Sequence, residues 1–127
     1  ISGKFLTGAS PGVISLFFAN THYPDFESYI FAIAEAMRYE YETVTNAGIM
    51  LQLDCPDLGM GRHIQYADLS LADFRKRAEL HVEALNHALE NVPRDMVRRP
   101  AARRYRHRVY GQCVGDILRS GEPAPRP

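Results

Sequence analysis

A short apolar run at residues 49–53 lies between two long segments whose apolar residues recur with the period of a helix. The run has the length of one strand, and its uninterrupted Ile-Met-Leu start is typical of a strand covered on both faces in a parallel sheet. Gly48 frees the backbone before the run, and Pro56 ends the strand after it. This stretch therefore predicts a strand within a β/α unit.

The segments on either side of the run each predict an amphipathic helix. Residues 24–47 carry one apolar stripe, and Gly48 is well placed to cap that helix. The second helix is expected to start at Ser70, because Asp73 three residues later approximates a capping box, and to end before Pro93. Its stripe is Leu71, Phe74, Ala78, Val82, Leu85, Leu89 and Val92. Our interpretation places His81 and His87 off this stripe, on the surface.

The first 24 residues predict a strand and leave one segment open. Residues 4–7 have the character of a short strand, and Ser10-Pro11 is typical of a helix start. Residues 13–18 have strand propensity, so helix and strand both remain possible there. We expect loops at residues 20–24 and 58–63 and the start of a third strand at 96–97.

The alternation of strands and helices predicts the α/β class, with parallel strands joined by right-handed crossovers and flanked by helices. An eight-stranded barrel needs about 250 residues, so this chain of 127 residues has room for only part of one. We expect residues 1–97 to form a partial (β/α)8 TIM-barrel-like fragment. Because the chain starts at Ile1, we also expect it to be a piece of a longer protein.

Charge divides the chain where the helical periodicity ends. Residues 1–96 carry seven Lys and Arg against thirteen Asp and Glu, whereas residues 97–127 carry eight Arg against two acidic residues. We expect residues 98–127 to be an irregular Arg/Pro-rich tail. Tyr105 and Tyr110 offer stacking surfaces between the arginines, but no nucleic-acid module is recognisable, so nucleic acid is not a favoured partner.

The location predicted for the chain is the cytoplasm. Its two cysteines, Cys55 and Cys113, are too far apart in sequence to indicate a disulfide framework, which favours a reducing compartment. No run approaches the roughly 18 consecutive apolar residues of a membrane span, and the start lacks the charge of a signal peptide. No membrane partner is therefore expected.

Two carboxylates, Asp54 and Asp57, follow the predicted strand at residues 49–53. Parallel α/β folds place their ligands at the carboxyl ends of their strands. A carboxylate there can hold a substrate ammonium or take up a proton, and the alternative is that one of the two braces the turn. We predict both as substrate-binding residues.

Cys55, between them, is a weaker candidate. A nucleophilic cysteine needs a nearby base, and only His63 is close in sequence, so packing at the strand end is the simpler interpretation. A zinc site built from Cys55, His63, His107 and Cys113 would have suitable ligand types but lacks the paired close spacing of recognisable sites. We therefore predict no metal ligand and no catalytic residue in this chain.

Two motifs carry a family resemblance over residues 3–97. Phe-Leu-Thr-Gly at residues 5–8 with Pro11, and Leu-Gln-Leu-Asp-x-Pro at residues 51–56, resemble the C-terminal catalytic barrel of cobalamin-independent methionine synthase, above all its shorter bacterial paralogues. Ala9 and Ser10 intervene before Pro11, where the family has none. The resemblance implies a TIM barrel and a 5-methyltetrahydropteroyltriglutamate-homocysteine S-methyltransferase-like activity. Such an enzyme moves a methyl group from a folate-type donor to the thiol of homocysteine, a step of methionine biosynthesis.

The resemblance also implies roles for single residues. Asp54 matches the aspartate that binds the substrate amino group, and Thr7 lies in the first motif. Phe17 falls near the tryptophan that contacts the pterin, so Thr7 and Phe17 complete the predicted substrate-binding set. Cys55 stands where the family has a glutamate, and Met60 where it has a glutamate that helps to bind folate.

The zinc implied by the family has no matching ligands here. The family's ligands are a His-x-Cys pair on the next strand and then a glutamate and a cysteine further on. Where the pair should appear, this chain has Val-Arg-Arg-Pro-Ala-Ala-Arg-Arg at residues 97–104. We therefore expect a fragment that is inactive by itself. The alternatives are another thiol (alkyl) transferase of the same superfamily, or a non-catalytic remnant or binding module that uses the Arg-rich tail. An incomplete barrel would expose sheet edges, which predicts self-association.

Overall fold

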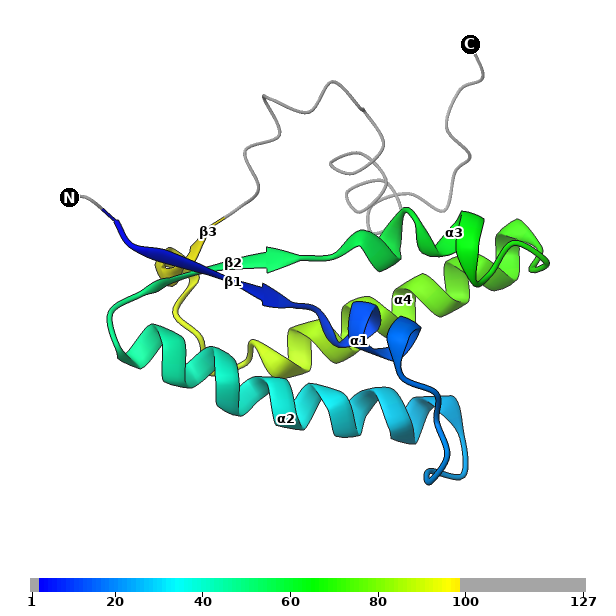
Figure 1. The fold of residues 1–127 in the computed structure, drawn as a ribbon, viewed down its shortest axis with the longest axis horizontal. Coiled ribbons are helices and arrows are strands. Elements are labelled where there is room, and N and C mark those ends of the chain that lie inside the picture. Colours follow the sequence, from blue (N-terminus) through cyan, green and yellow to red (C-terminus); the bar gives the residue numbers. More distant parts are fainter. Residues whose placement is uncertain (1–2, 99–127) are drawn as a thin grey trace, which may run out of the picture.

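Three parallel strands organise the computed structural model, which describes residues 3–98 (Figure 1). Strand β1 (Phe5–Ala9) pairs with β2 (Met50–Asp54), which pairs with the two-residue strand β3 (Val97–Arg98). With the helices that flank this sheet, the described residues have a mixed α/β fold. The parallel arrangement predicted from the alternation of elements is confirmed.

Two long helices, α2 (Phe26–Asn46) and α4 (Leu71–Ala88), pack on each other and lie on the same face of the sheet (Figure 1). The shorter elements are α1 (Pro11–Phe17), η1 (Pro56–Leu58), α3 (Gly61–Ile64) and η2 (Arg94–Met96). The side chains of Ser10, Asp25 and Ser70 cap α1, α2 and α4 by accepting backbone N–H bonds. Sequence patterns predicted the serine caps, and the structure confirms them.

The main apolar core lies between the sheet and these two helices. Its fully buried members include Ile30 and Tyr41 from α2, Leu51 from β2 and Ala84 from α4. A second cluster is made of Leu58, Phe74, Ala78 and Val82. Most of the apolar stripe predicted for each long helix faces the core. Leu71, predicted in the α4 stripe, is an exception: it is the first residue of the helix and is 55% exposed, whereas Ala84 and Ala88, outside the predicted stripe, are buried.

One face of the sheet is left without a helix among the described residues. Leu51, Leu53 and Val97 pack into the core, and side chains alternate along a strand, so their neighbours point the other way. We call this opposite side the helix-free face. Its residues are Phe5, Thr7, Ala9, Met50, Gln52, Asp54 and Arg98. Among residues 3–98 only the core side of β2 carries helices, so the cover expected on its second face stays a prediction.

Several local predictions can be compared with the structure. Residues 13–18, left open between helix and strand, are mostly helical, because the Ser10 cap and Pro11 start α1. Residues 58–63, expected as a loop, contain most of α3. Helix α4 ends at Ala88 rather than near Val92. Beyond Ala88, backbone N–H groups bond to the carbonyl three residues earlier in place of four, as Val92 N–H does to Leu89 C=O.

Three further predictions concern Gly48, the Arg/Pro-rich tail and membrane-spanning helices. Gly48 adopts a φ of +73°, as expected for a glycine that ends a helix. Arg98, the first residue of the predicted irregular tail at 98–127, belongs to β3, and the rest of that tail, with His107 and Cys113, lies outside the described residues. Within residues 3–98, no helix has the length and apolar character needed to cross a membrane.

Candidate functional site

A buried polar network joins three segments at the carboxyl end of the sheet. The Ser10 hydroxyl donates to Asp57 Oδ1 over 2.8 Å, and Asp57 Oδ2 lies 2.8 Å from His81 Nδ1. Ser10 Oγ also accepts the N–H of Val13 at 3.1 Å. Ser10, Asp57 and His81 are each 2% exposed, so we call them the buried polar network. Because carboxylate oxygens accept hydrogen bonds, Nδ1 is the nitrogen of His81 that carries a proton here.

Aromatic rings enclose the imidazole of His81. Phe26 stacks on it with ring centres 5.7 Å apart, and the Tyr66 hydroxyl lies 3.4 Å from Nε2. The Arg77 guanidinium covers the outer side of Phe26, 3.9 Å from the ring centre. Burial raises the pKa of Tyr66, although the positive charge of Arg77 acts against that rise. The imidazole is therefore held on several sides and is closed to solvent.

Placing His81 on the surface was wrong. His81 follows Phe74 by seven residues and Ala78 by three, which is the spacing of one helix face, and both of those residues are buried. The spacing alone would have put His81 on the apolar stripe. His87 is half-buried where α2 and α4 meet, with 35% of its side chain exposed.

The two predicted aspartates occupy different environments. Asp54 ends β2 opposite Ala9 and is exposed on the helix-free face. Its carbonyl accepts the Ser10 N–H at 3.0 Å, which ties the ends of β1 and β2 together. Asp57 is interior and uses both carboxylate oxygens within the buried polar network, so it is closed to a ligand in this conformation.

The remaining predicted substrate-binding residues come from β1 and α1. Thr7 is exposed on the helix-free face opposite Gln52, two residues before β1 ends. Phe17 is 78% exposed and ends α1. Thr7 and Asp54 therefore share one face of the sheet, whereas Phe17 belongs to the helix that follows β1.

Cys55 directly follows β2 and is half-buried. Burial, and next the negative charge of Asp57, raise the pKa of its thiol from 9.0 to about 12. The thiol therefore carries its proton at neutral pH. Burial also raises the pKa of the Tyr41 hydroxyl, which donates to the Ala9 carbonyl.

The described residues do not fit the zinc site that the resemblance implies. Among residues 3–98, no three or more His, Cys, Asp and Glu side chains are grouped to hold a metal ion. The buried imidazole of His81 is already bonded through Nδ1 to Asp57. We assign no catalytic step to a metal held by these residues.

Comparison with known proteins leaves the family open. No family model matches this sequence. The curated proteins and the solved structures likewise contain no match. The observations that bear on the function of the chain are therefore its own geometry and the two motifs that carry the resemblance.

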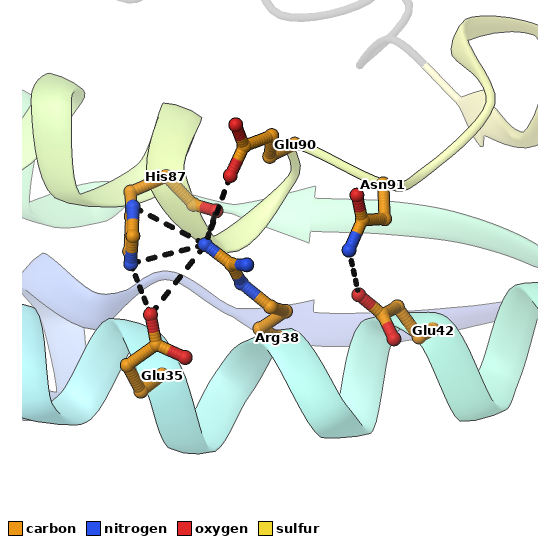
Figure 2. Close-up of polar contacts among 6 residues, drawn as sticks. All are labelled: Glu35, Arg38, Glu42, His87, Glu90 and Asn91. Carbon is orange, nitrogen blue, oxygen red and sulfur yellow. Dashed lines mark hydrogen bonds and ion pairs between the residues drawn. The ribbon is translucent and has the colours of Figure 1, made fainter.

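Two further features lie away from the Asp54 end of the sheet. Arg38 on α2 meets His87 in the last turn of α4 and Glu90 just beyond that helix, and Glu35 also contacts His87 (Figure 2). A hollow of about 700 Å³ is lined by Asn86, Leu89, Glu90, Val92, Arg94 and Val97. None of the buried polar side chains lines this hollow, so we do not treat it as the candidate site.

Proposed function

We propose that residues 3–98 are part of a (β/α)8-type barrel of the methionine-synthase-like family, and that this part holds an amino-acid thiol such as homocysteine through Asp54. The parent activity is the transfer of a methyl group from a methylated folate-type donor to that thiol, in the cytoplasm. In this proposal the chain itself binds the amino acid but does not catalyse the methyl transfer.

The order of the strands supports a barrel. Strands β1, β2 and β3 follow one another in the sheet as they do in the chain, and α2 and α4 lie on one face (Figure 1). A barrel has all its helices outside, so this arrangement fits a segment of a barrel; one half of a doubly wound sheet also has its helices on one face, and the two motifs of the resemblance favour the barrel. The helix-free face then corresponds to the interior of the barrel, and Asp54 to its carboxyl-terminal rim.

The exposed carboxylate of Asp54 is the observation that carries the proposal. It lies on the helix-free face at the end of a parallel strand, and it forms no ion pair with a residue among 3–98. A carboxylate in that position can hold a ligand ammonium by a charge-assisted hydrogen bond.

In this proposal the buried polar network positions Asp54. The Ser10 side chain is held by Asp57, while its backbone N–H holds the carbonyl of Asp54. His81 completes the hydrogen bonds of the Asp57 carboxylate from α4. The network thus sets where β2 ends, which fixes the direction in which the Asp54 side chain leaves the sheet.

A ligand titration followed by backbone amide NMR tests the proposal. L-Homocysteine and L-methionine should shift amide signals at residues 52–57 of the full chain. Asp54→Asn, which is isosteric, should weaken this binding on the order of 10-fold, because a hydrogen bond to a charged group is lost. Asp68→Asn alters another exposed carboxylate and should leave the affinity unchanged.

Equal affinity of the wild type and Asp54→Asn would contradict the proposal, as would shifts confined to other parts of the chain. A methyl-transfer assay with a methylated folate donor addresses the second part. Activity of the isolated chain would contradict its assignment as a non-catalytic part of the barrel.

A further inference from the structure

The hollow of about 700 Å³ beyond the end of α4 has an apolar base and a polar rim. Val92 is buried there, and Leu89 and Val97 are half-buried. The rest of the lining is polar and exposed, and consists of Asn86, Glu90 and Arg94. An apolar base within a polar rim fits the apolar side of an amphipathic helix.

The order of the sheet places this hollow on the path of the chain beyond β3. The strands follow one another as β1-β2-β3, and α2 and α4 lie on the same face (Figure 1). Right-handed connections between parallel strands put successive helices on one face of a sheet. Val97 on β3 lines the hollow, and β3 ends one residue later at Arg98. A helix that follows β3 on that face would therefore lie against the hollow.

The sequence beyond β3 contains a segment with the apolar period of a helix. Within residues 110–118 the apolar residues recur at positions i, i+3, i+4, i+7 and i+8, which form one stripe on a helix. These residues are Tyr110, Cys113, Val114, Ile117 and Leu118. Arg119, Gly121 and Pro123 follow in the order typical of a helix end. Residues 99–109 connect β3 to the segment, which is more than the roughly 2–6 residues of an ordinary strand-to-helix loop.

This segment is too weak a helix former to be stable by itself. It is shorter than the roughly 12–15 residues that an isolated helix needs in water. It also contains Gly111 and Gly115, and glycine disfavours a helix relative to alanine. A helix here therefore depends on burial of its apolar stripe against another element.

We propose that residues 110–118 form a helix that docks its apolar stripe into the hollow, beside α4, and completes a third β/α unit. The apolar base of the hollow receives the stripe. The charges also match, because Arg94 on the rim makes no ion pair with another residue among 3–98, and Asp116 is the acidic residue of the segment. This inference does not rest on the binding of an amino acid by Asp54.

The reactivity of Cys113 measures the docking, because this thiol belongs to the stripe. Disulfide exchange at Cys113 is followed in the full chain on a Cys55→Ala background, before and after denaturation. Docking should slow the folded chain on the order of 10-fold relative to the unfolded chain. Ile117→Asn, in the stripe, should remove most of this protection. Gln112→Asn, outside the stripe, is the matched control and should keep it.

Methyl NMR of the full chain shows where the segment docks. Nuclear Overhauser effects should join the methyl groups of Ile117 and Leu118 to those of Leu89 and Val97, and amide spectra verify the fold of each variant. The inference is overturned if Cys113 reacts equally fast in both states, or if Ile117→Asn and Gln112→Asn are equally protected. Contacts of the stripe with the helix-free face would also overturn it. Protection that rises with protein concentration would identify a second copy as the occupant and would overturn it too.

Discussion

Gly12 is the residue on which the buried polar network depends most directly. A Cβ at this position would lie 2.0 Å from Asp57 Oδ2 and 2.5 Å from His81 Nδ1. Both neighbours are buried in the interior, so neither can swing away into solvent. The absence of a side chain at Gly12 therefore allows helix α1 to approach the Asp57–His81 pair.

Replacing Gly12 with alanine should destabilise the chain by at least about 2 kcal/mol, because overpacking separates a buried hydrogen-bonded pair. Urea unfolding followed by circular dichroism measures the change. Gly61→Ala is the matched control, since its Cβ would meet Tyr66 at an ordinary 3.5 Å, and it should change stability by less than about 1 kcal/mol. Similar stabilities for the two variants would show that the network tolerates a methyl group.

The half-buried thiol of Cys55 should react slowly. A pKa of about 12 in place of 9.0 lowers the thiolate fraction on the order of 1,000-fold at any pH below both values. The greater nucleophilicity of a less acidic thiolate recovers roughly 20-fold, which leaves a rate about 50-fold lower than that of an ordinary thiol. Disulfide exchange on a Cys113→Ser background, before and after denaturation, measures this ratio. Equal rates in the two states would contradict the assigned environment.

The same pKa shift predicts how stability varies with pH. The folded chain holds the Cys55 proton more tightly than the unfolded chain, so this contribution is fully present below pH 9.0 and is lost towards about pH 12. Burial of Tyr41 and Tyr66 acts in the same direction. The free energy of unfolding should therefore fall in the alkaline range, and less steeply in Cys55→Ala than in the wild type.

At the scale of elements, polar contacts bind α2 to α4 beside the apolar core. Arg38 Nη2 donates to the His87 carbonyl at 3.0 Å, in the last turn of α4, and to Glu90 Oε2 at 3.1 Å, just beyond that helix (Figure 2). A second contact joins Asn91 Nδ2 to Glu42 Oε1 at 2.8 Å. These bonds link residues about 50 positions apart in sequence, so they fix how the two helices align.

Arg38→Met keeps much of the apolar stem and removes these bonds, and we expect a loss of about 1 to 2 kcal/mol. The side chain of Arg38 is only 21% exposed, which limits screening by solvent. Lys76→Met is the control, because its contact with Asp73 is 3.8 Å long between exposed side chains and should contribute less than about 0.5 kcal/mol. Chemical unfolding of both variants tests the difference, and equal losses would contradict a specific role for the α2–α4 contact.

At the scale of the whole molecule, β1 forms an edge of the described sheet, paired only with β2. Leu6 on this strand is 45% exposed, and the strand contains no proline or charged residue to discourage pairing with another chain. The edge of β1 is therefore where we expect copies of this chain to associate.

Light scattering over a range of protein concentrations should show self-association of the wild type. Leu6→Lys should shift the population towards monomer, because a charge on an edge strand opposes pairing. Leu71→Lys places the same charge at an exposed leucine that starts α4 and should have no such effect. A wild type that stays monomeric at high concentration would rule out this edge as an association surface.

The sequence alone determined the order and type of the main elements. The hydrophobic period, the serine caps and Gly48 are local signals, each set by residues that are close together in sequence. Helices α2 and α4 and strands β1 and β2 could therefore be predicted near their observed positions. The resemblance predicted Asp54 as a substrate-binding residue. The apolar run at residues 49–53 independently predicted that Asp54 follows the end of a strand.

Only the tertiary structure decided which polar groups are buried and which face of the sheet is free. His81 and Ser10 reach Asp57 from 24 and 47 residues away, so no local pattern could pair them. Thr7, Gln52 and Arg98 likewise lie side by side only through the register of three strands from distant parts of the chain. A buried charge is tolerated only where partners converge on it, and that convergence is set by packing rather than by neighbours in sequence.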